Sequence, residues 1–470
     1  MTGDTIAAVI TAAGIGAMGA LRLSGPNAFG AVAQVFRSKR DRSIEELAEY
    51  SLTYGGVYLK GAYADQALML KMKAPHSFTG EDVAELQCHG GPVVMRQLLA
   101  ELTSIPGVSV RPAEPGEFSR RAFLNGKMDL SQAEAIMELV SASNPRAAAL
   151  AANQIEGRLY QKLKQLGDGI LTLLAEIEME VDFPEEEIAS PLEGESKLDQ
   201  ARHMLAYADA LLDSADRGRV YREGIRVVFY GRPNAGKSSL LNGILQEPRA
   251  IVTPEPGTTR DVLEEQVIVK GVPLVLTDTA GVSQAGSLAE QAGMDRAREM
   301  AARADLLLYV IDSREGLTEE DKALLSELDR EKTILVWNKE DLLADKESAM
   351  YKGDAPWETR PGIGRYAQCS LSALDHGSLD VLAERIRAFF DENDGRREGE
   401  AIVLNRRQHI ALLNTKQAIA SAVEAMASGV PEDVAAIDLK QAWSFLGELT
   451  GEALQTALVE KIFSTFCLGK

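Results

Sequence analysis

The spacing of apolar residues changes character along the chain. Up to about residue 125, short β-like runs at Tyr54–Leu59 and Leu68–Met72 alternate with turns rich in glycine and proline, which predicts a compact α/β domain. From Leu130 onward, apolar residues recur at helical spacing. Asn144-Pro145 is typical of a capped helix start, and it predicts a helix that continues to Leu159.

A second change occurs at Ile225, where short apolar runs alternate with helical stretches, as in a sheet built from βα units. The candidate buried strands are Arg226–Tyr230, Leu274–Thr277, Asp305–Ile311 and Thr333–Trp337. Helical periodicity resumes after Asp394-Gly395. Because domains tolerate insertions where their ends lie close together, we expect both helical segments to form one domain that contains the α/β insert. A separate C-terminal helical domain is the alternative.

The predicted fold is therefore multidomain, α/β plus all-α. We expect an N-terminal α/β domain over residues 1–125, a helical domain over 126–220 and 393–470, and an inserted α/β domain over 221–392.

Composition limits the possible partners. The chain of 470 residues is 45% hydrophobic, enough for ordinary globular cores, and its net charge of −20 opposes binding to a polyanion. Residues 1–125 hold 12 basic and 12 acidic residues, so the acidic excess lies in the remainder. Any RNA contact must therefore be local or shared with a partner. The three cysteines are widely spaced and no segment is apolar enough to span a membrane, which predicts a cytoplasmic protein.

A phosphate-binding loop follows the first predicted strand of the insert. Residues 231–238 match G-x-x-x-x-G-K-[ST] and precede a helical run, which is the context this motif requires. Its backbone N–H groups can bind phosphates, Lys237 can reach the β and γ oxygens, and the Ser238 hydroxyl can ligate Mg²⁺. The predicted nucleotide contacts in this segment are Gly231, Asn234, Ala235, Gly236, Lys237, Ser238 and Ser239.

The base is identified further along the chain. Asn338-Lys339-Glu340-Asp341 follows a predicted strand, and the Asp341 carboxylate can accept hydrogen bonds from both donors of guanine, whereas adenine lacks this pair. A backbone N–H of Ser372-Ala373-Leu374 can reach the guanine carbonyl oxygen. These motifs, in this order, predict a Ras-like domain that binds GTP.

Two further segments would surround the γ-phosphate. Asp278-Thr279-Ala280-Gly281 follows a predicted strand, so Asp278 can hold Mg²⁺ and Gly281 can contact the phosphate, while Thr258-Thr259 lies in a loop suited to cover it. We expect Thr259 to ligate Mg²⁺. The residue after Gly281 is Val282, at the position where Ras-like proteins carry a glutamine that orients water. Hydrolysis therefore needs other groups. Acidic candidates lie downstream at Glu290 and Asp295.

Motifs outside the insert are similar to those of the MnmE (TrmE) family of tRNA-modification GTPases. They are Arg22-Leu23-Ser24-Gly25, Ser77-Phe78-Thr79-Gly80-Glu81-Asp82, Pro115-Gly116-Glu117-Phe118, Arg121-Ala122-Phe123-Leu124-Asn125-Gly126-Lys127 and the terminal Cys467-Leu468-Gly469-Lys470. The resemblance covers essentially the whole chain. It departs at Ala12-Ala13-Gly14-Ile15-Gly16-Ala17, where the family usually has a Pro-Pro-Gly-Arg-Gly-Gly-like loop.

The resemblance implies more than GTP hydrolysis. Proteins of this family act on tRNA with an FAD-dependent MnmG-type partner, adding an aminomethyl or carboxymethylaminomethyl group to C5 of the wobble uridine with a carbon from tetrahydrofolate. It implies that the N-terminal domain forms a homodimer and binds 5-formyltetrahydrofolate or another tetrahydrofolate derivative near the dimer interface. It also implies a heterotetramer or larger complex with the partner. The residues that match the folate site are Arg22, Glu85, Lys127 and Lys470. Cys467 matches a terminal thiol and is a candidate nucleophile or redox group.

The resemblance also implies how hydrolysis is completed. In the family the G domains dimerise and K⁺ occupies the place of an arginine finger. The K⁺ ligands by this match are Asn234, Thr253, Glu255 and Thr258, and Glu290 matches the residue that organises the attacking water. The predicted catalytic residues are Lys237, Thr259, Asp278, Glu290 and Cys467.

Two other functions share some of these features. A ribosome-assembly switch GTPase has the same nucleotide motifs but normally carries a basic RNA-binding domain, which the acidic composition opposes. A self-sufficient folate-dependent one-carbon transferase would use GTP only as a regulator. Folate binding separates the first alternative from the tRNA-modification hypothesis, and a requirement for the flavin partner separates the second.

Overall fold

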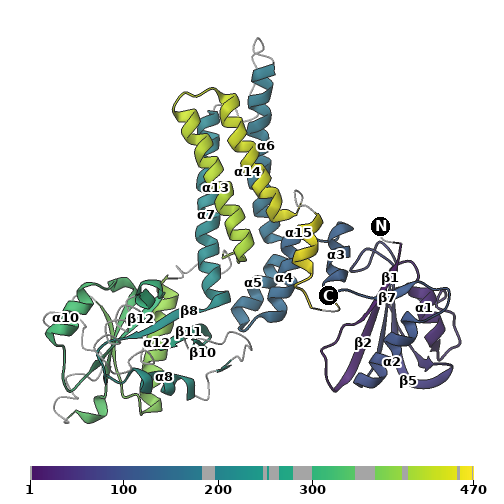
Figure 1. Cartoon of the computed structure of the whole chain (residues 1–470), viewed down its shortest axis with the longest axis horizontal. Helices are drawn as coiled ribbons and strands as arrows, with labels where there is room; N and C mark the ends of the chain where they lie inside the picture. Colours follow the sequence, from purple (N-terminus) through teal and green to yellow (C-terminus); the bar gives the residue numbers. More distant parts are fainter. Residues whose placement is uncertain are drawn as a thin grey trace. The chain divides into compact units, whose positions relative to one another are not determined.

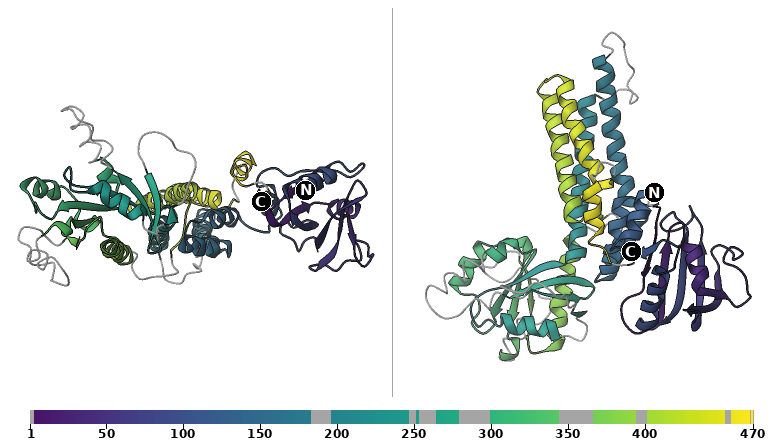
Figure 2. Two further views of the ribbon diagram at one scale, coloured as in Figure 1. Left: turned by 90° about the horizontal axis from the view of Figure 1, so that it is seen from below. Right: turned by 45° about the vertical axis from the view of Figure 1, so that its right-hand side comes forward.

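The computed structural model describes residues 3–182, 196–246, 251–252, 264–278, 299–343, 366–393, 401–451, 456–467 and 469 (Figure 1). The chain divides into two compact units. Unit 1 comprises Met1–Val140, Ala152–Asp209 and Arg406–Lys470, and unit 2 comprises Ser141–Ala151 and Ala210–Asn405. Two further views are given in Figure 2.

The N-terminal part of unit 1 is built on a seven-stranded sheet with the strand order β3-β4-β5-β6-β2-β1-β7. Its strands are β1 Thr5–Val9, β2 Gly16–Ser24, β3 Phe36–Ser38, β4 Leu52–Leu59, β5 Ala62–Met72, β6 Val83–Gly90 and β7 Val110–Pro112. Neighbouring strands are antiparallel except for β1 and β7, which are parallel.

The two faces of this sheet are covered differently. On one face, α1 (Ala28–Val35) and α2 (Pro92–Thr103) form a core with every second strand residue, including Ala67 and Met69 of β5. On the other face, Phe118 of α3 (Glu117–Leu124) packs on Ile6 and Ala8 of β1. The strand alternation thus supplies two cores, a large one beneath the helices and a small one beside β1.

The helical part of unit 1 is a bundle of long helices. Its elements are α4 Leu130–Ser141, α6 Arg158–Asp182, α7 Lys197–Glu223, α13 Arg406–Ala427, α14 Glu432–Thr450 and α15 Thr456–Phe463, with α7 continuing into unit 2. α14 packs on both α13 and α6, and Lys416 of α13 pairs with Asp209 of α7 (Figure 1). The helices before and after the insert therefore form one domain, as predicted, and the alternative of a separate C-terminal helical domain is wrong.

One predicted helix ends earlier than expected. α5 spans Pro145–Ile155, and a new helix, α6, begins at Arg158. The break occurs because Gly157 adopts a left-handed φ of 84°, which ends a right-handed helix at little cost. The predicted start is correct, since Asn144 Oδ1 accepts a hydrogen bond from the Ala147 N–H at 2.8 Å.

Unit 2 contains a second seven-stranded sheet with the order β14-β13-β12-β8-β11-β10-β9. Its strands are β8 Ile225–Tyr230, β9 Ile251–Val252, β10 Glu264–Val269, β11 Val272–Asp278, β12 Leu306–Asp312, β13 Thr333–Asn338 and β14 Ala367–Ser370. Its helices include α8 Lys237–Gln246, α10 Glu319–Ser326 and α12 His376–Asn393. The central strands are parallel, and β10 is antiparallel to β9 and β11. All four predicted buried strands are present.

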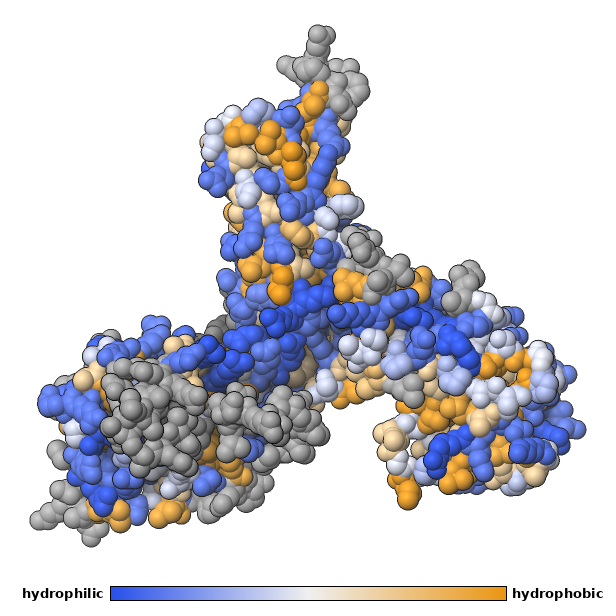
Figure 3. Space-filling view, in the orientation of Figure 1, coloured by the Kyte–Doolittle hydropathy of each residue, from blue (hydrophilic) through white to orange (hydrophobic). Residues whose placement is uncertain are grey.

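The residue pattern explains this arrangement. The central strands are buried on both faces, and every residue of β12 is buried, so they read as continuous apolar runs. Figure 3 shows hydrophilic residues over much of the visible face of the molecule, with apolar patches between them. Among the residues described, no helix is long and apolar enough to cross a membrane.

Candidate functional site

The phosphate-loop motif lies between β8 and α8 and depends on its glycines. Gly231 has a φ of 128°, and a Cβ there would lie 2.5 Å from the Val310 carbonyl oxygen. Gly236 has a φ of 99°, and its Cβ would lie 2.1 Å from Asn338 Nδ2. Both the backbone angles and the close approaches exclude a side chain. Asn234, between them, takes a left-handed φ of 61°.

The cationic side chain of the loop is held by the loop itself. Lys237 Nζ donates to the carbonyl oxygens of Gly231 at 2.8 Å and Arg232 at 2.7 Å. Ser238 and Ser239 are exposed in the first turn of α8, where the helix presents unpaired N–H groups. An ammonium group beside a helix N-terminus forms a site suited to phosphate.

Asn338 connects the three nucleotide motifs. It is 1% exposed at the end of β13, its Nδ2 donates to the Ala235 carbonyl oxygen at 3.0 Å, and its Oδ1 accepts from the Ala373 N–H at 3.0 Å. The buried amide therefore satisfies both of its ends, one on the phosphate loop and one on the Ser372–Leu374 segment.

Lys339 links the base motif to the phosphate loop through a residue that sequence reasoning missed. Its Nζ donates to the Asn234 carbonyl oxygen at 2.7 Å and forms an ion pair with Asp312 Oδ2 at 2.7 Å. Hydrogen bonds from Arg314 and Lys339 hold the pKa of the Asp312 carboxyl well below its usual range. The sequence could have indicated Asp312, because it is an acidic residue directly after the predicted strand Asp305–Ile311. Ligands of such sheets bind at the carboxyl ends of the parallel strands.

The phosphate loop is also joined to the rest of the unit by Arg232. Its Nε lies 3.2 Å from Oδ2 of the buried Asp321, which accepts from the Tyr309 hydroxyl at 2.8 Å. The same Asp321 caps α10 through Thr318. Burial and the hydrogen bond to Asp321 raise the pKa of Tyr309.

The predicted guanine contacts lie at the exposed side of this arrangement. Asp341 is exposed in the short helix η3 (Glu340–Leu342), and Leu374 is 82% exposed, whereas Ser372 is buried. The motifs thus leave the Asp341 carboxylate accessible to a ligand while Asn338 fixes the backbone beneath it.

Several predicted residues lie outside the described residues. They are Thr253, Glu255, Thr258, Thr259, Thr279, Ala280, Gly281, Glu290 and Lys470, together with the side chain of Asp278, the last residue of β11.

The structure brings together one predicted pair in the N-terminal domain. Arg22 of β2 is directly opposite Glu85 of β6, and Arg22 Nε donates to Glu85 Oε1 at 2.7 Å. The guanidinium also lies over the rings of Phe78 and Phe118, with its Cζ 5.3 and 5.6 Å from their centroids. A planar cation held between two aromatic rings beside a carboxylate can bind a flat polar heterocycle.

The four N-terminal motifs meet around Arg121, which is 4% exposed. Its guanidinium donates to Asp4 Oδ1 at 2.9 Å, Glu81 Oε2 at 3.1 Å and Glu117 Oε1 at 3.1 Å. Ser24 also donates to Glu81 Oε2, at 2.6 Å. Opposite charges are therefore paired throughout this buried network.

Lys127 lies close to this network. Its side chain passes Gly80, and its Nζ donates to the Pro75 carbonyl oxygen at 3.1 Å. Among the residues described, no hydrogen bond joins Lys127 to Arg22 or Glu85.

The C-terminal segment contacts the Pro115–Phe118 motif. Gly116 has a φ of 67°, its N–H donates to the Cys467 carbonyl oxygen at 3.3 Å, and a Cβ there would lie 2.3 Å from the Phe463 carbonyl oxygen. A cavity of about 490 Å³ beside this contact is lined by Arg111, Glu114, Pro115, Arg120, Glu460, Phe463 and Ser464. The Cys467 thiol is exposed, whereas burial raises the pKa of the Cys88 and Cys369 thiols to about 12.

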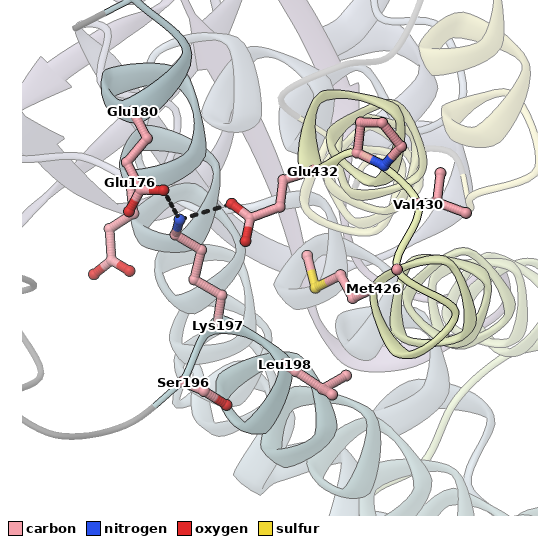
Figure 4. Close-up of a pocket in the computed structure, with 10 residues that line it drawn as sticks. Glu176, Glu180, Ser196, Lys197, Leu198, Met426, Val430 and Glu432 are labelled. Carbon is pink, nitrogen blue, oxygen red and sulfur yellow. Dashed lines mark hydrogen bonds and ion pairs between the residues drawn. The ribbon is translucent and has the colours of Figure 1, made fainter. Parts of the chain in front are cut away.

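A further cavity, of about 530 Å³, lies at one end of the helical bundle. Figure 4 shows Lys197 between carboxylates of neighbouring helices; it pairs with Glu180 and, at 2.7 Å, with Glu432. These pairs fix the start of α7 to α6 and α14. Within the described part of the chain, no group of three or more histidine, cysteine or acidic side chains is placed to hold a metal ion.

Comparisons with known proteins agree over the whole chain. Residues 5–127 match the family model of the GTP-binding protein TrmE N-terminus, and residues 130–467 match that of the MnmE helical domain. The tRNA modification GTPase MnmE of Lactiplantibacillus plantarum is 39% identical over 99% of this chain and 98% of that protein. That of Carboxydothermus hydrogenoformans is 40% identical over the full length of both. A solved structure of an Aquifex aeolicus Era variant bound to GDP and AlF4⁻ is similar over 41% of this chain and 66% of that chain, with 23% identity and a TM-score of 0.28.

Proposed function

The chain belongs to the MnmE family of tRNA modification GTPases, and we propose that it modifies the wobble uridine of tRNA together with a flavin-dependent MnmG-type partner. It is a GTP-hydrolysing enzyme that takes part in tRNA modification. The proposed product carries an aminomethyl or carboxymethylaminomethyl group on C5, with its carbon drawn from tetrahydrofolate. Family membership removes the ribosome-assembly alternative.

The observation that supports the nucleotide site best is the pair of hydrogen bonds made by Asn338. They hold the phosphate loop, the base motif and the Ser372–Leu374 segment in one arrangement. In the proposed complex, backbone N–H groups of the phosphate loop and the Lys237 ammonium bind the phosphates of GTP, and Ser238, Thr259 and Asp278 hold Mg²⁺. Thr279, Ala280 and Gly281 contact the γ-phosphate, and Asp341 and Ala373 contact guanine.

Hydrolysis is completed by K⁺ and a second G domain in this proposal. The backbone of Asn234 is fixed by Lys339 while its side chain is exposed, which leaves the amide oxygen available to a cation. Thr253, Glu255 and Thr258 would complete the K⁺ site, and Glu290 would orient the attacking water. A monovalent cation there would offset charge that develops on the phosphates.

The K⁺ hypothesis is tested by GTP turnover at matched ionic strength. We expect turnover in KCl to exceed that in NaCl and to fall in the Glu290→Ala variant. Equal rates in the two salts would disprove the cation site, and an undiminished rate in the variant would disprove the role of Glu290.

The folate site is proposed at Arg22 and Glu85, with Lys127 and Lys470 as further contacts. Support comes from the Arg22 guanidinium between Phe78 and Phe118, paired to a carboxylate that can accept from a pterin edge. Calorimetry with 5-formyltetrahydrofolate is expected to show binding that Glu85→Gln weakens. Glu101→Gln, which changes a half-buried carboxylate on α2, is the control and should leave the binding unchanged. Equal affinities for the three proteins would contradict the assignment.

Within the cytoplasm, the proposed working assembly is a homodimer joined to the flavin partner in a heterotetramer or larger complex. Its proposed domains span residues 1–125, 126–220 with 393–470, and 221–392. Cys467 is proposed as a nucleophile or redox group.

The decisive experiment is nucleoside analysis of wobble uridines after deletion of the gene. Loss of the C5 modification supports the proposal, and an unchanged nucleoside profile overturns it.

A further inference from the structure

Three tyrosines lie on the sheet face of the N-terminal domain that α1 and α2 leave uncovered. Tyr54 of β4 is 49% exposed and Tyr63 of β5 is 63% exposed. Tyr58 lies edge-on to Tyr63, with ring centroids 5.7 Å apart and an interplanar angle of 78°. We call Tyr54, Tyr58 and Tyr63 the tyrosine platform. Tyr54 and Tyr63 therefore expose aromatic surface on which a planar group can stack.

The strand geometry places these rings on one face. Gly56 is two residues after Tyr54, so both residues face the same side, and a Cβ on Gly56 would lie 3.0 Å from Tyr63 Cε2 and 3.4 Å from Tyr58 Cε2. The missing side chain therefore leaves space for both rings. Tyr58, two residues after Gly56, faces the same side, while Val57 lies in the core beneath α1. A register shift between Val57 and Tyr58 pairs Tyr58 with Tyr63 and so brings Tyr63 of β5 to this side as well.

Basic residues adjoin the platform along the chain, on the edge strand β3, in the segment that follows it and in the turn after β4. They are Arg37, Lys39, Arg40, Arg42 and Lys60, all exposed. Arg37, on the edge strand β3, is directly opposite Gly56 of β4, and its Cζ lies 4.4 Å from the Tyr58 ring centroid. Within the described part of the chain, none of these five cations has a carboxylate within ion-pair distance. We call them the basic rim.

The nearby acidic groups do not cancel the rim. Residues 37–42 contain four basic residues and one acidic residue, Asp41. Other carboxylates near this edge are engaged elsewhere or point to backbone groups: Asp65 bonds to His89, Glu46 accepts from the Ser43 N–H, and Glu101 accepts from the Lys60 N–H. Glu45 and Glu49 are exposed on the following segment. The domain has equal numbers of basic and acidic residues, so the rim is a local concentration of positive charge.

We propose that the tyrosine platform and the basic rim bind single-stranded RNA. Unpaired bases would stack on Tyr54 and Tyr63, and phosphates would be neutralised by Arg37, Lys39 and the rest of the rim. Double-stranded RNA keeps its bases stacked inside the helix and does not present them to a flat aromatic surface. A basic surface of this kind supplies the local contact that a chain of net charge −20 requires.

The platform shares its face with the proposed folate pair. Tyr54 is opposite Leu68 on β5, and Leu68 is opposite Gln87 on β6, two residues from Glu85. Cross-strand partners project to the same side of a sheet. This inference rests on the proposed function for the identity of the RNA, which would then be the anticodon loop that carries the wobble uridine.

The stacking half is tested by fluorescence anisotropy of the full chain with a labelled stem–loop RNA that has unpaired uridine in its loop. Tyr63→Leu keeps an apolar side chain but removes the ring, and we expect it to weaken binding roughly tenfold or more. Tyr63→Phe keeps the ring and is expected to bind within about twofold of wild type. Equal affinity of Tyr63→Leu and wild type, or equal affinity for the stem–loop and a fully paired duplex, would overturn the proposal.

The charge half is tested by the salt dependence of the same binding. Removing two cations with Arg37→Gln and Lys39→Gln together is expected to reduce the slope of log affinity against log salt by about 1.4, or about 0.7 for each phosphate that is no longer neutralised. The matched double variant Lys162→Gln with Lys164→Gln, on α6, removes the same charge and is expected to keep the wild-type slope. The same slope in both double variants would overturn the role of the rim.

These readouts separate the RNA surface from the wider function. GTP turnover without RNA is expected to be unchanged in every variant, and unchanged hydrogen exchange of peptides from residues 4–125 shows that the N-terminal domain is folded. If deletion abolishes the wobble modification but the Tyr63→Leu variant binds RNA normally, the proposed function stands and the RNA surface is wrong. If the variant loses RNA affinity while deletion leaves wobble uridines unchanged, the surface stands and the proposed function is wrong.

Discussion

The phosphate loop and the N-terminal polar network distribute charge in opposite ways. In the loop, Lys237 donates to two main-chain carbonyl oxygens, and Lys339 donates to the Asn234 carbonyl oxygen and pairs with one carboxylate, Asp312. In the network, Arg121 contacts three carboxylates and is almost fully buried. The first arrangement is suited to binding an anion, and the second stabilises the domain. Substitutions should therefore change affinity in one region and stability in the other.

The largest expected effect is on base recognition. Asp341→Asn replaces one acceptor by a donor, so the preference for GTP over XTP should fall by about 10³-fold or more. Competition of the two nucleotides for the full chain measures it. Asp380→Asn, a carboxylate on α12 that pairs with Lys270, is the control and should leave the preference unchanged. An unaltered preference in Asp341→Asn would remove this residue from the guanine site.

The next effect tests the stabilising role of the network. Arg121→Met removes the cation that pairs with Glu81 and one of the cations that pair with Asp4 and Glu117, which keep Arg111. The loss should destabilise the N-terminal domain by about 3–5 kcal/mol. Hydrogen exchange of peptides from residues 4–125 measures this loss, and GTP affinity should stay at the wild-type value. Arg158→Met, which removes an exposed pair with Glu156, should have little effect. Weaker GTP binding together with normal hydrogen exchange in Arg121→Met would show that Arg121 affects nucleotide affinity and not the stability of the N-terminal domain.

A smaller effect is expected where one charge pair supports the loop. Asp312→Asn weakens the position of Lys339 on the Asn234 carbonyl, so GTP affinity should fall roughly tenfold. Arg314→Gln removes the other partner of Asp312. The Arg314 side chain is 48% exposed, so this change should alter GTP affinity less than about twofold. Equal losses in the two variants would contradict the role of the Asp312–Lys339 contact, because Arg314→Gln leaves that contact in place.

The smallest effect concerns pH. Burial opposes ionisation of Glu117, but hydrogen bonds from Arg111, the Glu114 N–H and Arg121 outweigh it and lower its pKa below the ordinary value of 4.5. A lowered pKa means that this stabilisation is present at neutral pH and is lost as pH falls below about 4.5. The difference in unfolding free energy between wild type and Glu117→Gln should therefore shrink by about 1 kcal/mol between about pH 6 and pH 3. A constant difference would contradict the lowered pKa.

The sequence predicted the nucleotide unit well because its signals are local. Each motif follows an apolar run, so predicting strands β8, β12 and β13 also placed the residues after them. The predicted end of the helix that starts at Pro145 was wrong because the break depends on one glycine, Gly157. Glycine adopts left-handed and right-handed backbone angles about equally well, so the sequence alone does not show that Gly157 is left-handed.

Contacts between distant segments were not predictable. Asp312 is a polar residue at a strand end, and only its 2.7 Å pair with Lys339 distinguishes it from a solvated one. In the same way, the part of α5 up to Ala151 belongs to unit 2, where the Arg146 guanidinium lies over Tyr221 and Phe390. The Arg22–Glu85 pair was inferred from the family resemblance, and the strand register supplies its physical cause.

The contact of Gly116 with the segment around Phe463 and Cys467 has a consequence for synthesis on the ribosome. Unit 2 ends at Asn405, so it can fold before that segment leaves the exit tunnel. The loop at Gly116 and the end of β1, where a Cβ on Gly469 would lie 2.8 Å from the Val9 carbonyl oxygen, gain their cover only afterwards. A nascent chain would thus hold a finished nucleotide unit while the domain translated first still awaits its last packing partner.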